Sequence, residues 1–133
     1  MIVRYQGTKP EYGSEGASCV DLKSTEFVII PRGFHKTIKT GLRIQLEPGM
    51  EAQVRGRSGM AARGVLAPSG TIDSDYRGEI AVILFNLSNV DCIINIGDRI
   101  AQLAICNVLH PVWEDRPLDE SSRGEGGFGS TGV

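Results

Sequence analysis

The sequence lacks the features that mark several large classes of protein. It has no excess of positive charge, since 14 lysine and arginine residues stand against 16 aspartate and glutamate residues and the formal net charge is -2. Proteins held electrostatically to duplex DNA or to a membrane surface normally carry a net excess of basic side chains. The longest apolar run, Ile80 to Phe85, is far shorter than the roughly 18 residues that span a bilayer, and Met1 to Gln6 has no signal-peptide pattern. We therefore expect a soluble protein of the cytoplasm, or of the nucleus in a eukaryote, that binds neither nucleic acid nor membrane directly.

Cysteine and histidine are also scarce. The three cysteines, Cys19, Cys92 and Cys106, are widely spaced and form no CxxC pair, and the two histidines are His35 and His110. An odd number of separated cysteines argues against a disulfide framework and favours a reducing compartment. These residues also lack the ligand spacing of an ordinary zinc site. We assign no function to them.

Aromatic residues make up only 6% of the chain, whereas glycine, with 17 of 133 residues, is about twice as frequent as usual. Short apolar stretches alternate with turn residues from Thr25 to about Leu109, which is typical of strands. The expected strands are Phe27–Ile30, Ile38–Leu46, Met50–Arg55, Ile80–Leu87, Cys92–Ile96 and Arg99–Val108, with a helical turn or two at Ser58–Arg63. Many short strands in a chain of one domain's length predict an all-β jelly-roll sandwich or barrel of about ten strands.

The composition changes after Trp113, where the chain becomes polar and then rich in glycine. We expect a β jelly-roll domain at residues 1–113 and a flexible C-terminal arm at residues 114–133. The arm contains the pattern GxGxxG at Gly124, Gly126 and Gly129. No strand leads into this pattern and no helix is expected to follow it, which excludes a dinucleotide-binding fingerprint. Closely approaching backbone N–H groups and nearby hydroxyls can instead surround a phosphate.

Two internal segments combine residue types that suit nucleotide chemistry. Around Ser58, a guanidinium, a hydroxyl and the expected start of a helix suit phosphate oxygens, with Ser58 in the N-cap position. A plain capped helix with solvated arginines is the alternative. In Gly70–Gly78, the carboxylates of Asp73 and Asp75 could hold a divalent cation or activate a water molecule. A surface loop with two solvated carboxylates is the alternative there.

Two other segments indicate little by themselves. Asp21 lies in the apolar stretch Ala17–Leu22, and Arg99 and Gln102 interrupt the apolar stretch Gly97–Leu103. An isolated polar residue in such a setting is equally typical of an ordinary strand edge. Their order in the chain, together with the other segments, carries more information than either one alone.

Taken in order, five segments resemble the five signature motifs of the trimeric deoxyuridine triphosphatases, or dUTPases. They are Ala17–Leu22, Arg57–Ala61, Gly70–Gly78, Gly97–Leu103 and Arg123–Gly132. The resemblance implies a jelly-roll protomer and a threefold homotrimer whose active sites each draw on more than one subunit. It also implies Mg²⁺-dependent hydrolysis of dUTP to dUMP and pyrophosphate, by attack of water on the α-phosphorus. Such an enzyme limits uracil incorporation into DNA and supplies dUMP for dTMP synthesis.

The resemblance implies a role for each matched residue. Asp73 is expected to be the base that activates the attacking water, a task that suits a carboxylate beside a metal-bound triphosphate. Asp21 is expected to hold Mg²⁺ through water, since this cation dehydrates reluctantly. The expected phosphate contacts are Arg57, Ser58 and Gly59, together with Gln102 from a neighbouring subunit.

The resemblance also implies how base and sugar are selected. Tyr76 is expected to lie under the deoxyribose and to clash with a 2'-hydroxyl. Backbone groups of Gly70 and Ile72, just before Asp73, are expected to read the uracil edge, and Phe128 to stack on the base. The other arm residues expected to contact substrate are Arg123, Gly129, Ser130 and Thr131, which would become ordered around it.

Two stretches depart from the family pattern. Ser18 and Cys19 stand where alanine and glycine are usual before Asp21. The segment Arg63–Gly70 is a few residues shorter than expected, with Ala67 near the position where many members carry asparagine. The sequence therefore leaves the stringency of uracil selection open.

Two other functions compete with dUTP hydrolysis. A deoxycytidine triphosphate deaminase of the same fold would need a glutamate at the cytosine ring, and none near the motifs is convincing. A protein that binds dUTP as a signal, with turnover secondary, is the other candidate. The retained acidic residues and the complete arm favour an enzyme, and they leave a second, protein-binding role open.

Overall fold

The structure, a computed structural model, describes residues 1–68 and 70–132. Ser69, in the short segment before Asp73, and Val133, the last residue of the expected arm, lie outside the described residues. The elements in chain order are β1 (Arg4–Gly7), β2 (Val20–Lys23), β3 (Val28–Ile30), β4 (His35–Gln45), β5 (Met50–Arg55), α1 (Ser58–Ala62), β6 (Val65–Leu66), β7 (Gly70–Ile72), β8 (Ile80–Asn86), β9 (Cys92–Ile94) and β10 (Arg99–Asn107).

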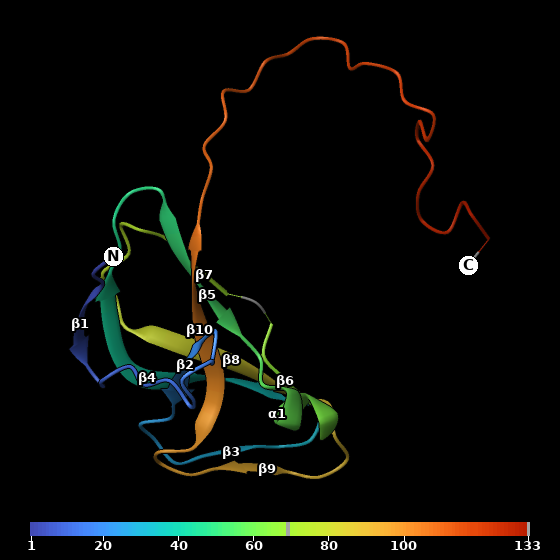
Figure 1. The fold of residues 1–133 in the computed structure, drawn as a ribbon. Helices are drawn as coiled ribbons and strands as arrows, with labels where there is room; N and C mark the ends of the chain where they lie inside the picture. The colour runs from blue at the N-terminus through green and yellow to red at the C-terminus, as the bar shows by residue number, and fades with distance from the viewer. Residues whose placement is uncertain (69, 133) are drawn as a thin grey trace.

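The strands form two four-stranded antiparallel sheets and a two-stranded ribbon (Figure 1). One sheet has the order β1-β4-β8-β6, the other has the order β2-β10-β5-β7, and β3 pairs with β9. Neighbours in each sheet are mostly far apart in the sequence, as in a jelly roll. The all-β jelly-roll sandwich predicted from the sequence is confirmed.

The core lies between the two sheets and is built by alternation along the strands. In β4 the side chains of Ile38, Leu42 and Ile44 are buried while their neighbours along the strand are more exposed, as the period-two pattern predicts. The polar Thr40 in the same row is also buried, and its hydroxyl donates to the Ile80 carbonyl on β8. Because the pattern places a whole row of side chains in the core, the register of β4 against β8 is strongly specified.

Four strands are absent from the sequence-based expectations. β1, β6 and β7 have two to four residues, and all four residues of β1 are exposed. β2 has four residues in the pattern buried, intermediate, buried, intermediate. Strands this short offer too few positions for an alternation to be recognised, so their place depends on the longer strands beside them.

The helix differs from the expectation in its first turn. The N-cap residue is Arg57, in an extended conformation, and no side-chain hydrogen bond caps the helix. The prediction that Ser58 is the N-cap is therefore wrong, because Ser58 is the first helical residue. An arginine at the N-cap leaves the serine hydroxyl exposed rather than used within the helix.

The C-terminal arm leaves the sandwich after β10 and arcs away from it (Figure 1). Its last backbone hydrogen bond to the sandwich, among the described residues, joins the N–H of Val108 to the carbonyl of Gly49 at 2.9 Å. Beyond that point the apolar side chains of Val112, Trp113 and Leu118 are exposed. Within the described ranges, no helix is long and apolar enough to cross a membrane.

Candidate active site

The sheet β2-β10-β5-β7 brings polar residues from three strands into one row. Gln102 on β10 lies opposite Asp21 on β2 and, on its other side, opposite Arg55 on β5. The flanking residues on β2 and β5, Val20 and Val54, are buried, so the row lies on the outer face of the sheet. The fold therefore joins the first and fourth of the five segments by strand pairing.

A hydrogen bond ties this row to the segment before α1. The Nε2 of Gln102 donates to the carbonyl of Gly56 at 2.9 Å. Gln102 thus reaches the residues at the start of α1 from within the same chain. The expectation that a neighbouring subunit supplies Gln102 beside Arg57 is corrected, because strand pairing already places the two together.

Arg57 is held by the first residue of β10. Its Nη1 donates to the carbonyl of Arg99 at 2.9 Å, while Nη1 of Arg99 lies 3.9 Å from Oδ2 of Asp21. The Asp21 side chain is only 19% exposed, so the carboxylate has a cation beside it in a partly desolvated setting. Asp21, Arg57 and Gln102, which we call the carboxylate–arginine cluster, form one continuous group through Arg99.

The loop that leads into Asp21 is braced by an ion pair. Nζ of Lys23 lies 2.9 Å from Oε2 of Glu11, and the Glu11 carbonyl accepts the N–H of Asp21 at 2.9 Å. The Lys23 ammonium beside Glu11 holds the pKa of that carboxyl below its ordinary value. The brace fixes the backbone on both sides of Asp21. No sequence pattern predicted this brace, because Glu11 lies ten residues upstream of Asp21 in a segment without a recognisable pattern.

The other matched residues of the second segment lie at the open end of the helix. Ser58 and Gly59 are both exposed. A Cβ atom at Gly59 would meet no heavy atom within 4 Å. Packing against the described residues therefore does not keep this position small, and it leaves space beside Arg57 for a ligand or for another subunit.

A shallow pocket adjoins the same helix between α1 and the strands β9 and β10. Its polar lining includes Arg57, Arg63, Asp98 and Arg99, with Cys92 on one side. Burial raises the pKa of the Cys92 thiol, which keeps it protonated and weakly reactive at neutral pH. The pocket therefore extends the basic surface beside the cluster without adding a nucleophile.

Asp73 stands at the end of a different strand. It follows directly on β7 and its side chain is exposed, and its carbonyl accepts the N–H of Tyr76 at 3.1 Å to form a turn. The Tyr76 hydroxyl donates to the carbonyl of Glu79 at 3.0 Å, which fixes the ring. A Cβ atom at Gly78 would lie 2.2 Å from that hydroxyl oxygen. A side chain at position 78 would therefore displace the tyrosine ring, which lies against the glycine.

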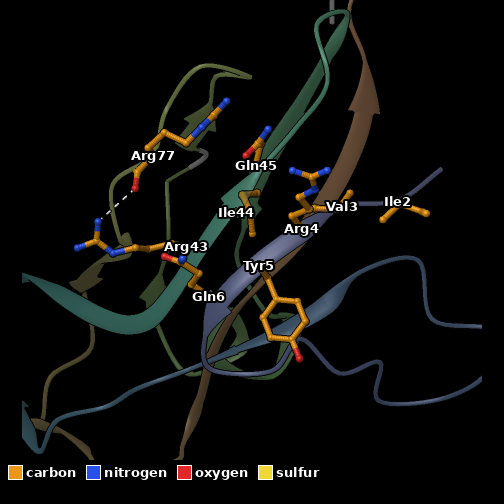
Figure 2. Close-up of a pocket in the computed structure, with 9 residues that line it drawn as sticks. All are labelled: Ile2, Val3, Arg4, Tyr5, Gln6, Arg43, Ile44, Gln45 and Arg77. Atoms are coloured by element: carbon orange, nitrogen blue, oxygen red, sulfur yellow. Dashed lines mark hydrogen bonds between the residues drawn. The ribbon is translucent and has the colours of Figure 1, made fainter.

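The loop is also fastened by two arginines. Nη1 of Arg77 donates to the carbonyl of Ser74 at 2.6 Å, and Nη1 of Arg43 on β4 donates to the carbonyl of Arg77 at 3.2 Å. Figure 2 shows this second bond at the edge of a groove between β1, β4 and the loop. These contacts present Asp73 and Tyr76 on a preorganised loop.

The arm carries the last group of expected site residues. Nε of Arg123 donates to the carbonyl of Gly126 at 2.7 Å, and the N–H of Ser130 donates to the carbonyl of Gly127 at 3.0 Å. The concave side of this curl is lined by Arg123, Gly126, Gly127, Phe128, Gly129, Ser130 and Thr131. Phe128 has a φ of 50° and is fully exposed, an unusual placement for an aromatic side chain.

The expected residues form three groups along one chain, and among the described residues no side-chain hydrogen bond or ion pair links one group to another. The carboxylate–arginine cluster lies on the outer face of one sheet, and Gly70, Ile72, Asp73 and Tyr76 lie on β7 and its loop. The arm residues lie far out along the arc of Figure 1. A complete site of all three groups needs the arm to fold back or residues from another copy of the chain.

The donor set fits magnesium better than a transition metal. Across residues 1–68 and 70–132, no group of three or more histidine, cysteine, aspartate or glutamate side chains could hold a metal ion. Asp21 is the carboxylate of the cluster beside Arg57 and Gln102. A single carboxylate, with water and phosphate oxygens completing the shell, is a common way to hold Mg²⁺.

Comparison with known proteins gives a consistent result. The dUTPase family model matches residues 6–132. The deoxyuridine 5'-triphosphate nucleotidohydrolase of Ehrlichia canis is 48% identical, and the match covers 93% of this chain and 86% of that protein. The enzyme of the same name from a Hydrogenobaculum species is 46% identical, with 98% of this chain and 94% of that protein covered.

The fold of this chain is also similar to solved structures. A variant of the Staphylococcus bacteriophage 80alpha dUTPase with dUpNHpp superimposes with a TM-score of 0.91 at 22% identity, covering 99% of both chains. A variant dUTPase from phage phi11 of S. aureus, described for its structural Mg(II) ion, gives a TM-score of 0.83 at 20% identity, covering 91% of this chain and 100% of that one. At these identities the likeness concerns the fold.

Proposed function

This chain belongs to the dUTPase family, and on that basis we propose that it hydrolyses dUTP to dUMP and pyrophosphate with Mg²⁺. The observation that carries the proposal is the joining of Asp21, Arg57 and Gln102 by strand pairing and hydrogen bonds, together with a separately braced loop that carries Asp73. A metal-holding carboxylate next to a guanidinium and an amide suits a triphosphate. An exposed carboxylate on a rigid loop suits the activation of water.

In the proposed site, Asp21 holds the hydrated cation, and Arg57, Ser58, Gly59 and Gln102 bind the phosphates. Arg57 keeps one guanidinium nitrogen on the Arg99 carbonyl, which leaves its remaining donors for phosphate oxygens. When bound, Mg²⁺ supplies charge neutralisation for the phosphates and orients them. The short helix contributes through its exposed serine hydroxyl rather than through a cap.

Asp73 is the proposed general base. A carboxylate oxygen of Asp73 takes a proton from water as the water oxygen forms a bond to the α-phosphorus. The bond between that phosphorus and the bridging oxygen of the β-phosphate then breaks, and pyrophosphate leaves with the bonding electron pair. A positioned base of this kind typically contributes about 10² to 10⁴ in rate.

Tyr76 and the strand before Asp73 are the proposed selectivity elements. Tyr76 is 42% exposed although its hydroxyl is anchored, which suits a residue that supports a sugar and excludes a 2'-hydroxyl. The backbone of Gly70 and Ile72 is proposed to read the uracil edge. The short loop before β7 makes base selectivity the part of this proposal that most needs measurement.

The arm is the proposed lid. Phe128 would stack on the uracil, and Arg123, Gly129, Ser130 and Thr131 would close over the phosphates. Full exposure of an aromatic ring on a glycine-rich segment supports this, since burying the ring on substrate removes its apolar surface from water. We propose residues 1–113 as the β domain and 114–133 as this arm.

We also propose a homotrimer with shared active sites. The extension of the arm away from the sandwich within one chain supports sharing (Figure 1). The outer face of β8 and β6 carries the exposed apolar residues Ile83, Phe85 and Leu66, which further supports contact with another copy. Acting on cytoplasmic nucleotides, such an enzyme would limit uracil incorporation into DNA and supply dUMP for dTMP synthesis.

The test is pyrophosphate release from dUTP, dCTP, dTTP and UTP, each with Mg²⁺ and with a chelator. We expect turnover of dUTP that depends on Mg²⁺ and little turnover of the other three. Turnover of nucleotides with several different bases would mean that the short loop before Asp73 does not select uracil. Tight dUTP binding without turnover in any condition would refute the proposed hydrolysis and favour a binding role.

A further inference from the structure

Regular alternation along β10 would place the Arg99 side chain in the core, but the structure places it on the outer face of the sheet. The register between β10 and β2 shifts between Arg99 and Ala101, because Arg99 lies opposite Lys23 and Ala101 lies opposite Leu22. Two consecutive residues, Ile100 and Ala101, are buried at this bulge. The extra residue reverses the alternation, so that Arg99 lies on the outer face with Gln102 instead of in the core.

On that face Arg99 makes two contacts with different parts of the residue. Its guanidinium lies beside the Asp21 carboxylate, with 3.9 Å between Nη1 and Oδ2, and its backbone carbonyl accepts from Arg57. The guanidinium distance is long for a charge-assisted hydrogen bond, which is typically about 2.7–2.9 Å. The Arg99 side chain is 53% exposed, so it can move away from Asp21 at little cost in packing.

The negative charge of Asp21 makes its contact with Arg99 important for nucleotide binding. A carboxylate repels a triphosphate unless a cation lies between them or beside them. In the structure the Arg99 guanidinium is the cation beside Asp21. A metal ion held by Asp21 would take over the same task, so Arg99 and Mg²⁺ compete for one carboxylate.

We propose that Arg99 is a positioning residue that neutralises and orients Asp21 when Mg²⁺ is absent and is displaced when Mg²⁺ arrives with the nucleotide. This inference rests on the proposed function for the identity of the nucleotide. It assigns Arg99 a role through Asp21 and gives its guanidinium no contact with the reacting atoms. The carbonyl contact to Arg57 is a property of the backbone and remains after any substitution that preserves the bulge.

The test compares Arg99→Gln, Arg99→Lys and the control Arg32→Gln, which removes the same charge from the turn after β3. Affinity for a non-hydrolysable α,β-imido analogue of dUTP is measured by calorimetry at low salt, with chelator and with Mg²⁺. We expect Arg99→Gln to weaken binding about fivefold in chelator and less than about twofold with Mg²⁺, a size typical of an exposed ion pair. Arg99→Lys and Arg32→Gln should bind like the unmodified chain in both conditions.

Two further experiments distinguish this role of Arg99 from a purely structural role and from the proposed function. In an Asp21→Asn background, Arg99→Gln should have no further effect in chelator. An equal loss with and without Mg²⁺, or an undiminished loss in the Asp21→Asn background, would overturn the proposal. Inorganic tripolyphosphate is titrated in parallel, and the same dependence on Arg99 and Asp21 is expected for it. If the unmodified chain fails to hydrolyse dUTP, the proposed function fails, while the tripolyphosphate titration still decides for or against Arg99.

Discussion

Replacing Gly78 by alanine tests whether the Tyr76 ring selects the sugar. A Cβ atom at position 78 would lie 2.2 Å from the Tyr76 hydroxyl oxygen, 2.4 Å from Cζ and 2.8 Å from Cε1. Such separations are far inside van der Waals contact, so the ring must leave its position. The hydrogen bond from the hydroxyl to the Glu79 carbonyl is then lost as well.

The expected effect on stability is small and the expected effect on selectivity is large. Loss of one hydrogen bond at a partly exposed site costs about 0.5–1.5 kcal/mol. A displaced ring no longer blocks the 2'-hydroxyl of a ribonucleotide, and shape discrimination of this kind is worth about 1–3 kcal/mol. The ratio of kcat/KM for dUTP to that for UTP should therefore fall by about 10-fold to 200-fold.

The assay is pyrophosphate release at a series of dUTP and UTP concentrations, together with thermal denaturation. Gly16→Ala is the matched control, because a Cβ atom at Gly16 would meet no heavy atom within 4 Å. Tyr76→Phe removes the hydroxyl and keeps the ring, so it should lose stability with little loss of sugar selectivity. An unchanged dUTP to UTP ratio in Gly78→Ala would refute the assignment of sugar selection to Tyr76.

The remaining predictions concern the base, the arm and the brace beside Asp21. Asp73→Asn should lower kcat by about 10² to 10⁴ while binding of the imido analogue stays within about threefold, and near-normal kcat would exclude Asp73 as the base. Deleting residues 123–133 should leave a folded oligomer of low activity, and loss of the oligomer on truncation would contradict this role for the arm. Refolding the truncated chains together with Asp73→Asn chains should restore activity if sites are shared. The lowered pKa of Glu11 means that its contribution to stability is present above the ordinary value of 4.5 and is lost as the pH falls through the lowered pKa. The difference in melting temperature between the unmodified chain and Glu11→Gln should accordingly shrink as the pH falls below 4.5, and a difference that does not shrink in acid would contradict the Glu11–Lys23 pairing.

The long strands could be predicted because alternation repeats over many residues. β4 places Ile38, Leu42 and Ile44 in the core in the rhythm that its sequence shows. The bulge at the start of β10 could not be predicted in the same way. Its position depends on where β2 pairs with β10, which is a tertiary property.

In the candidate site, too, the sequence predicted the residues but not their tertiary arrangement. The ordered match of five segments to the family motifs identified Asp21, Arg57, Asp73 and Gln102 as expected site residues, although the segments of Asp21 and Gln102 indicate little by themselves. Which of them share one cluster was not in any local pattern, and the expectation for Gln102 failed for that reason. Arg99 was visible in the sequence as a polar residue in an apolar stretch, but only the register shift explains why it faces Asp21.

The measurement that tests the central claim most directly is hydrolysis of dUTP in H₂¹⁸O with Mg²⁺, followed by mass spectrometry of both products. Attack of an Asp73-activated water on the α-phosphorus predicts one ¹⁸O atom in dUMP and none in pyrophosphate from a single turnover. Asp73→Asn should form neither product at a comparable rate. Label found in pyrophosphate, or release of phosphate with dUDP, would contradict the proposed reaction.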